Sequence, residues 1–125
     1  MKKTSNTPPE ALLDAVVKGL DDIKGQDITI VDLREITHAI SSYFVIAHGS
    51  SHTQVEALAQ SVEKVCWEAL GDKPVSVQGL RNGEWAIIDF FDVVVHVFHE
   101  EARIRYGLEE LWGDAEIRKI ETIEA

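Results

Sequence analysis

The chain has 125 residues, of which 45% are hydrophobic and 27% are charged, and this fits one globular domain with a core of its own. The net charge of −10 and the lack of clustered Lys and Arg argue against a nucleic-acid groove, and favour either plain solubility or a basic protein partner. No apolar run approaches a membrane span, the basic start lacks the apolar segment of a secretory signal, and a single cysteine suits a reducing cytoplasm.

The first third of the chain predicts a helix followed by a strand. Residues 1–7 form a tail that we expect to be disordered. Thr7, Pro8 and Glu10 have the types and spacing of a helix start, with Thr7 as the cap and Pro8 in the first helical position. Apolar residues at helical spacing follow, and Gly25 ends the helix. Residues 27–33 predict a strand, and residues 34–42 continue as a polar bridge with a short helical patch.

The middle third predicts a central strand and a long helix. Residues 43–47 are almost wholly apolar, which is typical of a strand covered on both faces. Ser50 and Ser51 then provide caps for a helix whose apolar residues recur at helical spacing as far as Leu70, and Gly71 ends it. Cys66 belongs to that apolar stripe, so we expect a core thiol there.

The last third predicts three strands and two short helices. The strands are residues 75–79, 84–90 and 93–98, and the helices are residues 100–106 and 108–112, separated by Gly107. Residues 114–125 form a charged tail, which is either an amphipathic helix or a frayed end. The order predicts an α/β (α+β) fold: a mixed sheet of about five strands packed with helices, within one domain at residues 8–113.

The two strands before the short helices predict a hairpin with two different faces. If Phe90 and Phe91 form a two-residue turn, Asp89 lies opposite Asp92 and Trp85 lies opposite His96. One face is then purely aliphatic and must be core. The other face holds Trp85, Ile87, Asp89, Asp92, Val94, His96 and Phe98. This mixture is typical of a protein interface, but it also fits a surface covered by the C-terminal helices with His96 hydrogen-bonded inside.

Catalytic and metal sites find little support in the sequence. His96 and His99 are three apart on a strand and point to opposite faces, and His48 and His52 have no third ligand nearby. The strand, turn and helix around Gly49 have the form with which nucleotidyltransferases bind phosphate, but no closely spaced pair of carboxylates follows to hold Mg²⁺. We therefore expect no catalytic residue, no metal and no cofactor.

Several motifs together resemble the ribosomal silencing factor family, also called Iojap. The motifs are Lys24-Gly25-Gln26-Asp27-Ile28, Val31-Asp32-Leu33, Tyr43-Phe44-Val45-Ile46 before Gly49-Ser50-Ser51, Gln54-Val55, the run from Trp85 through Asp89 and Asp92 to Phe98, and the block from Arg103 through Tyr106, Leu108, Glu109 and Leu111 to Trp112. The resemblance covers roughly residues 10–113. It implies a nucleotidyltransferase-like fold without the active site, in a protein that is often a homodimer when free.

The resemblance also implies a non-enzymatic function in the cytoplasm. Members bind the large ribosomal subunit through ribosomal protein L-fourteen, block its joining with the small subunit, and repress translation under nutrient limitation or in stationary phase, a form of ribosome hibernation. The expected partner-binding residues are Trp85, Ile87, Asp89, Asp92, Val94, His96 and Phe98, supported by Tyr106, Leu108, Leu111 and Trp112. Asp89, Asp92, Glu109 or Glu110 would meet basic side chains of the partner.

The chain departs from the family pattern at two positions, where Ser42 replaces an Asp and Phe91 replaces a Gly. Phe91 bears on the assumed turn, because Gly adopts a positive φ at little cost and Phe does not. Two alternatives to the silencing factor remain: a nucleotidyltransferase-like enzyme, or a dimeric adaptor for another basic protein.

Overall fold

The computed structural model describes residues 7–121, which form four helices and six strands. In chain order these are α1 (Pro9–Asp22), β1 (Gln26–Asp32), β2 (Tyr43–Gly49), α2 (His52–Leu70), β3 (Ser76–Gln78), β4 (Trp85–Asp89), β5 (Val93–His99), α3 (Glu100–Tyr106), α4 (Leu108–Leu111) and β6 (Glu116–Lys119). The tail predicted at residues 1–7 lies almost wholly outside the described residues.

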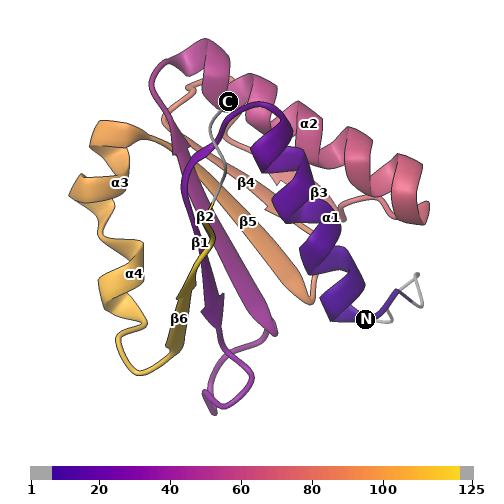
Figure 1. Ribbon diagram of the computed structural model, residues 1–125. Coiled ribbons are helices and arrows are strands. Elements are labelled where there is room, and N and C mark those ends of the chain that lie inside the picture. The colour runs from indigo at the N-terminus through magenta and orange to yellow at the C-terminus, as the bar shows by residue number, and fades with distance from the viewer. Residues whose placement is uncertain (1–6, 122–125) are drawn as a thin grey trace.

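All six strands belong to one mixed sheet in the order β3-β4-β5-β2-β1-β6. The central strands β2 and β5 run parallel, and every other neighbouring pair is antiparallel. Helices α1 and α2 cover one face of the sheet, while α3 and α4 lie on the other (Figure 1). The predicted mixed sheet packed with helices is confirmed, with six strands in place of about five.

The two long helices begin and end where local chemistry favours it. Helix α1 starts at Pro9, whose fixed φ suits the first turn, and Pro8 occupies the cap position that we had assigned to Thr7. The side chain of Ser51 caps α2 by accepting a backbone N–H of its first turn, as predicted. Helix α2 ends at Gly71, which has a positive φ of 64° and satisfies the last carbonyls.

The sheet separates two apolar clusters of unequal size. The larger cluster lies between the sheet and the α1–α2 layer and contains the aliphatic face of the β4–β5 hairpin together with Cys66, and burial raises the pKa of that thiol to about 12. The smaller cluster lies under α3 and α4 and has Phe98 and Leu108 among its buried members. Because α3 and α4 are short, they leave part of this face of the sheet uncovered.

The β4–β5 hairpin has a different register from the one we predicted. Asp89 lies opposite Val94 and Trp85 lies opposite Phe98, so the two-residue turn is at Phe91 and Asp92. Phe90 therefore lies in the core with 4% of its surface exposed. The two faces of the hairpin keep their predicted members from the strands, because the register moved by two residues and side chains alternate with a period of two.

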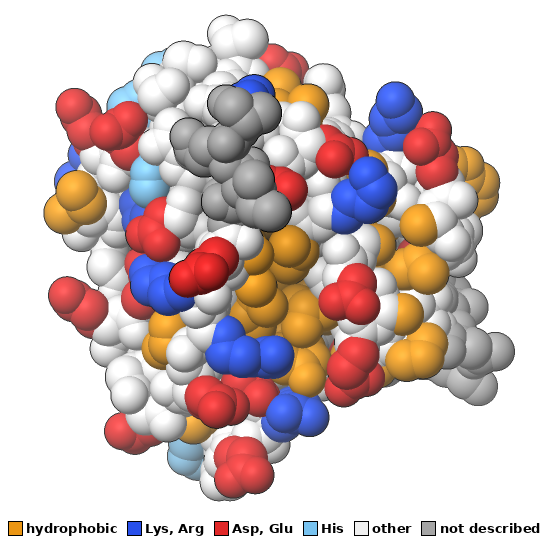
Figure 2. All heavy atoms as spheres, in the orientation of Figure 1, with side chains coloured by type: hydrophobic (Ala, Val, Ile, Leu, Met, Phe, Trp, Pro, Cys, Tyr) orange, Lys and Arg blue, Asp and Glu red, His pale blue; other side chains and the backbone are white. Residues whose placement is uncertain are grey.

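Two segments differ from their predicted structure. Residues 34–42 form turns and bends with no helix. The segment Glu116–Lys119, which we expected in a helix or a frayed tail, pairs with β1 as an antiparallel edge strand. Residues 122–125 lie outside the described part of the chain, so the predicted division into domain and tails stays a prediction. Figure 2 shows basic side chains standing beside acidic ones on the side that carries β6 and α1.

Candidate functional site

The candidate site is the side of β4 and β5 that faces away from α1 and α2, which we call the aromatic face. Its members, from these strands, from β2 and from the C-terminal helical region, are Phe44, Trp85, Ile87, Asp89, Val94, His96, Phe98, Tyr106 and Trp112. The alternating pattern of each strand brings the predicted strand residues together, except Asp92, which lies in the turn. Phe44 is a member that we had not assigned a role.

Aromatic rings form a continuous chain across this face. The centroid distances are 5.7 Å for Trp112–Phe44, 4.6 Å for Phe44–His96, 5.9 Å for His96–Trp85, 5.0 Å for Trp85–Phe98 and 4.8 Å for Trp85–Tyr106. Edge-to-face and offset contacts at these separations stabilise ring pairs beyond the area they bury. The chain of rings therefore fixes the rotamers of side chains that are partly open to solvent.

His96 is the polar member at the centre of the ring chain. Only 6% of its surface is exposed, and its Nδ1 accepts a hydrogen bond of 3.0 Å from the indole Nε1–H of Trp85. The neutral imidazole therefore carries its proton on Nε2, which has no hydrogen-bond partner among the described residues. Burial lowers the pKa of His96 to about 4, so the ring is neutral near pH 7.

The C-terminal helices cover one part of the face and leave another part open. Phe98 is fully buried and Leu108 is 8% exposed, so both belong to the core and not to a contact surface. Trp85 and Ile87 are half-buried, while Tyr106 is 47% and Leu111 is 74% exposed. His96 is therefore hydrogen-bonded inside, as expected for a covered surface, while aromatic and aliphatic groups remain accessible around it. The interpretation of the accessible part as a protein interface stays a prediction.

Asp89 and Asp92 lie at the end of the face where the hairpin turns. The carboxylate of Asp89 accepts the backbone N–H of Phe91 at 2.7 Å, and the carbonyl of Asp92 accepts the backbone N–H groups of Ser42 and Tyr43. Both side chains are only partly buried, so two carboxylates stand at this margin of the face. Glu109 does not join them, because Arg103 binds it internally.

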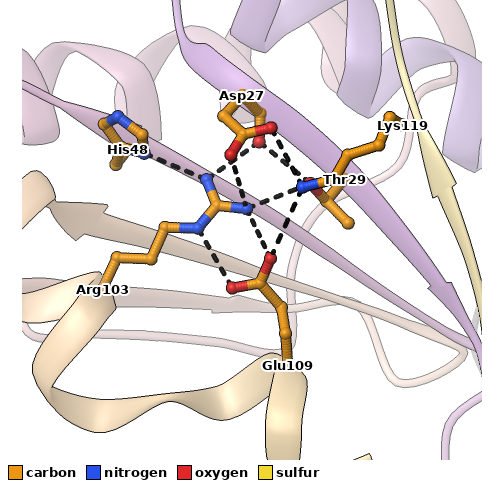
Figure 3. Close-up of polar contacts among 6 residues, drawn as sticks. All are labelled: Asp27, Thr29, His48, Arg103, Glu109 and Lys119. Carbon is orange, nitrogen blue, oxygen red and sulfur yellow. Dashed lines mark hydrogen bonds and ion pairs between the residues drawn. The ribbon is translucent and has the colours of Figure 1, made fainter. Parts of the chain in front are cut away.

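Arg103 is buried at the opposite margin and joins four elements of the fold (Figure 3). Its guanidinium forms two hydrogen bonds with the carboxylate of Glu109, at 3.2 and 2.8 Å. It also donates to the carbonyl of Asp27 at 2.8 Å and to the hydroxyl of Thr29 at 3.0 Å, and it lies 3.0 Å from Nδ1 of His48. The side chain of Arg103 is 6% exposed, so this cluster anchors α3 and α4 to β1 and β2.

Charged and hydrogen-bonded neighbours within this cluster shift the pKa values of its titratable side chains. The hydrogen bonds from Arg103 hold the pKa of Glu109 below its ordinary value. Burial and the neighbouring Arg103 charge lower the pKa of His48, which keeps that imidazole neutral as an acceptor. Burial raises the pKa of Asp27, but the hydrogen bond from Lys119 and the charge of Arg103 outweigh it and bring the pKa below 3.8. The sequence offered no signal for this cluster, because its members are far apart along the chain.

The turn after β2 has its own internal partner. Oε1 of Gln54 accepts the backbone N–H of Ser50 at 2.8 Å, and its Nε2 donates to the carbonyls of Ile23 and Lys24. A side-chain oxygen thus occupies the place where a phosphate would meet this turn in a nucleotide-binding protein. The strand, turn and helix around Gly49 are therefore present as predicted, but the backbone N–H of Ser50 is already bound by Gln54.

The described residues contain no group of three or more His, Cys, Asp and Glu side chains arranged to hold a metal ion. His52 and His99 do come together, with ring centroids 5.5 Å apart, although neither strand periodicity nor spacing had paired them. Among the same residues, no helix is both long and apolar enough to cross a bilayer.

Comparisons with known proteins agree on one family. The family model described as "Ribosomal silencing factor during starvation" matches residues 5–125. The ribosomal silencing factor of Halalkalibacterium halodurans is 38% identical over 114 residues, covering 91% of this chain and 96% of the relative. That of Bacillus subtilis is 35% identical over 112 residues, covering 90% and 93%. The chloroplastic Iojap protein of Zea mays is 27% identical, over 90% of this chain and 53% of its own.

Solved structures give the same result for the fold. A crystal structure of a protein from Chromobacterium violaceum superposes with a TM-score of 0.81 at 34% identity, and covers 95% of both chains. Another, from Bacillus halodurans, superposes with a TM-score of 0.74 at 35% identity and covers 90% of this chain and 98% of its own.

Proposed function

The chain belongs to the ribosomal silencing factor family, and from this premise we propose that it binds the large ribosomal subunit through ribosomal protein L-fourteen. Bound there, it prevents the small subunit from joining and so represses translation in the cytoplasm under nutrient limitation or in stationary phase. The action is steric: a folded domain seated on the subunit-facing surface occupies volume that the small subunit needs, and no chemical step is required.

The observation that carries this proposal is the rigid aromatic face. Trp85 and Tyr106 are partly exposed, yet their rings are held by contacts with Phe98 and by the bond from Trp85 to His96. Aromatic side chains with fixed rotamers lose little conformational entropy on binding, and Trp and Tyr dominate the energy of protein interfaces. The open part of the face thus has the properties of an anchor for a protein partner.

Charge supports a basic partner at the rim of the face. Asp89 and Asp92 stand at one margin, Glu110 is an exposed residue of α4, and the whole chain carries a net charge of −10. Ribosomal proteins are generally basic because they contact RNA, so opposite charges would steer the two surfaces together. Rim charges of this kind raise the association rate more than they raise affinity.

The direct test is cosedimentation of the purified protein with large ribosomal subunits. Replacing Trp85 with Glu removes an anchor and places a charge in the aromatic face, so we expect at least a 30-fold loss of affinity, the size of a hot-spot effect of about 2 kcal/mol. Trp67→Glu is the matched control: Trp67 is a 53% exposed tryptophan of α2, in the other helical layer, and its replacement should leave binding unchanged.

Two further variants separate lost contact from lost fold, because Trp85 is itself partly buried. Tyr106→Glu and Leu111→Glu alter side chains that are 47% and 74% exposed, so the fold tolerates them. We expect each to weaken binding by roughly three- to tenfold while leaving the melting temperature within a few degrees of the parent. If Trp85→Glu, Tyr106→Glu and Leu111→Glu are all folded and all bind large subunits fully, the aromatic face is not the binding site. If only Trp67→Glu loses binding, the binding site lies on the α2 layer.

The proposal of a non-enzymatic role draws on Gln54. Its side chain already occupies the donor of Ser50 at the turn where a nucleotide would bind. We therefore expect the melting temperature to stay constant when millimolar nucleotide and Mg²⁺ are added. A rise in melting temperature that is larger in Gln54→Ala would favour the nucleotidyltransferase-like enzyme. The adaptor would be favoured if the protein does not bind large subunits and binds another basic protein through Trp85.

A further inference from the structure

Phe91 has a strained backbone and a side chain that the core does not use. Its φ of 78° makes it the central residue of a γ-turn, a conformation that a bulky residue adopts only with strain. The side chain is 36% exposed, and it belongs to neither apolar cluster of residues 7–121. Exposed apolar side chains are common by themselves, but this one stands where Gly would be more stable, so packing does not explain it.

Two side-chain hydrogen bonds hold this backbone in place. The carboxylate of Asp89 accepts the N–H of Phe91 at 2.7 Å, and the hydroxyl of Ser41 donates to its carbonyl at 2.8 Å. The next residue of the same loop, Ser42, donates its backbone N–H to the carbonyl of Asp92. Strained residues that neighbouring groups maintain in this way cluster at functional sites. The ring of Phe91 is thus presented to solvent on a fixed backbone.

The loop between β1 and β2 presents a second exposed apolar side chain beside this turn. Ile40 is 83% exposed and, like Phe91, belongs to neither apolar cluster of the described residues. The same loop packs Ile36 and Ala39 against the smaller cluster, together with Trp85 of the aromatic face. The loop projects beyond the ends of β1 and β2 (Figure 1). Ile40 and Phe91 therefore extend the aromatic face past the hairpin turn.

We propose that Phe91 is a binding anchor which, together with Ile40, contacts an apolar area bordered by Lys or Arg on the basic protein of the large subunit. This inference rests on the proposed function and enlarges its contact surface beyond the strands and the C-terminal helices. A ring on a fixed backbone loses little conformational entropy on binding, and aromatic anchors contribute strongly to protein interfaces. The carboxylate of Asp89 beside the ring favours basic side chains around the contact.

Cosedimentation with large subunits, combined with thermal melting of the same variants, tests the anchor. Phe91→Gly should bind about three- to tenfold more weakly and yet melt a few degrees higher, because the ring is lost while the strain is relieved. A variant that gains stability does not lose affinity through misfolding. Phe91→Ala should lose affinity equally without melting higher. Phe91→Leu keeps a large apolar side chain at the strained position, so it should keep most of the parent affinity.

Two further variants examine the extent of the contact. Ile40→Ser alters a side chain that packs in neither cluster, so it should weaken binding by a similar factor and leave the melting temperature unchanged. Ile23→Ala is the matched control for the loss of apolar surface. Ile23 is also 36% exposed, but it lies at the end of α1 in the other helical layer, so its replacement should leave binding at the parent level.

The outcomes separate this anchor from the proposed function. If Trp85→Glu loses binding while Phe91→Gly and Phe91→Ala bind like the parent, the proposed function stands and the anchor is wrong. A parent protein that does not bind large subunits overturns both. Equal losses of affinity in Ile23→Ala and Phe91→Ala would also contradict the anchor, as would a lower melting temperature of Phe91→Gly, because the ring would then serve the fold.

Discussion

The imidazole of His96 is buried between Trp85 and Phe44 and must be neutral to stay there. Burial lowers its pKa in the folded state to about 4, against an ordinary value of 6.5. As the pH falls, His96 is therefore protonated near pH 6.5 in the unfolded chain but only near pH 4 in the folded chain. The contribution of His96 to the free energy of unfolding is fully present above pH 6.5. It is lost as the pH falls from 6.5 to about 4, and the total loss is about 3 kcal/mol.

Chemical denaturation at several pH values checks this prediction. The free energy of unfolding should fall between pH 6.5 and pH 4, and the slope attributable to His96 should disappear in His96→Gln, whose side chain does not titrate. His38→Gln is the control, because it makes the same substitution at an exposed histidine in the loop between β1 and β2. An equal slope in parent and His96→Gln would mean that other groups cause the acid sensitivity.

Phe91 adopts a positive φ of 78° at the hairpin turn, a conformation that a bulky residue enters only with strain. The backbone N–H of Asp92 donates to the carbonyl of Phe90 at 3.0 Å, so Phe91 is the central residue of a γ-turn at the start of the two-residue hairpin loop. The bond from the backbone of Phe91 to Asp89 and that from Ser41 to its carbonyl hold it in place.

Replacing Phe91 with Gly should raise the free energy of unfolding by about 0.5–1 kcal/mol. The strain of about 1–2 kcal/mol is relieved, and the greater freedom of Gly in the unfolded chain offsets part of that gain. Phe91→Ala is the control, since it removes the ring and keeps a Cβ at the strained position, so it should give no gain. Equal destabilisation by both variants would show that the ring's packing outweighs the backbone strain.

At the scale of elements, α3 and α4 depend on one buried guanidinium. Arg103 binds Glu109 through two nitrogens and reaches β1 through Asp27 and Thr29. Lysine has a single nitrogen and cannot reproduce this fork. Arg103→Lys should therefore lower the free energy of unfolding by about 2–4 kcal/mol, because buried acceptors lose their donors.

Arg105→Lys is the matched control within the same helix. Arg105 pairs with Glu84 at 2.9 Å, but both side chains are at least half exposed, so the change should stay within about 0.5 kcal/mol. Urea denaturation of the two variants measures the difference. A cost for Arg103→Lys as small as that for Arg105→Lys would contradict the anchoring role, and hydrogen exchange in α3 would show whether the helix has loosened.

For the whole molecule, the acidic surface predicts how the proposed complex responds to salt. The screening length falls from about 10 Å at 0.1 M salt to about 3 Å at 1 M. The association rate with large subunits should therefore fall steeply as salt rises, while the dissociation rate, set by the aromatic contacts, changes little. Surface-immobilised subunits and a salt series measure both rates. A salt-independent association rate would mean that charge plays no part in the encounter.

Subunit joining is the functional measurement at the same scale. Saturating protein should lower the fraction of joined ribosomes in a sucrose gradient, and Trp85→Glu should not, because it does not stay bound. Trp67→Glu should act like the parent. Joining that is unaffected by a protein that binds would contradict steric exclusion, and joining that falls equally with Trp85→Glu would contradict the aromatic face.

Most strand residues of the aromatic face could be predicted, because a register error of two residues does not change the face to which a strand side chain points. The predicted hairpin paired Trp85 with His96, whereas Trp85 lies opposite Phe98, yet a register that moves by two residues leaves each strand side chain on its face. Asp92 was misplaced because the turn itself moved by one residue. Phe44 was missed because no local pattern says that β2 lies beside β5, a pairing that a long connection brings about.

Most of the helices and strands, the buried stripes and the family could be inferred from the sequence, because caps, periodicity and ordered motifs are local properties of the chain. How far α3 and α4 cover the aromatic face could not be inferred from the sequence, since the coverage depends on the lengths of these helices relative to the width of the sheet. The fold also assembled the Arg103 cluster, in which Asp27 and Lys119 are 92 positions apart. Strand β6 shows the same limit: its four residues are all exposed, and they become a strand because the edge of β1 supplies the hydrogen bonds.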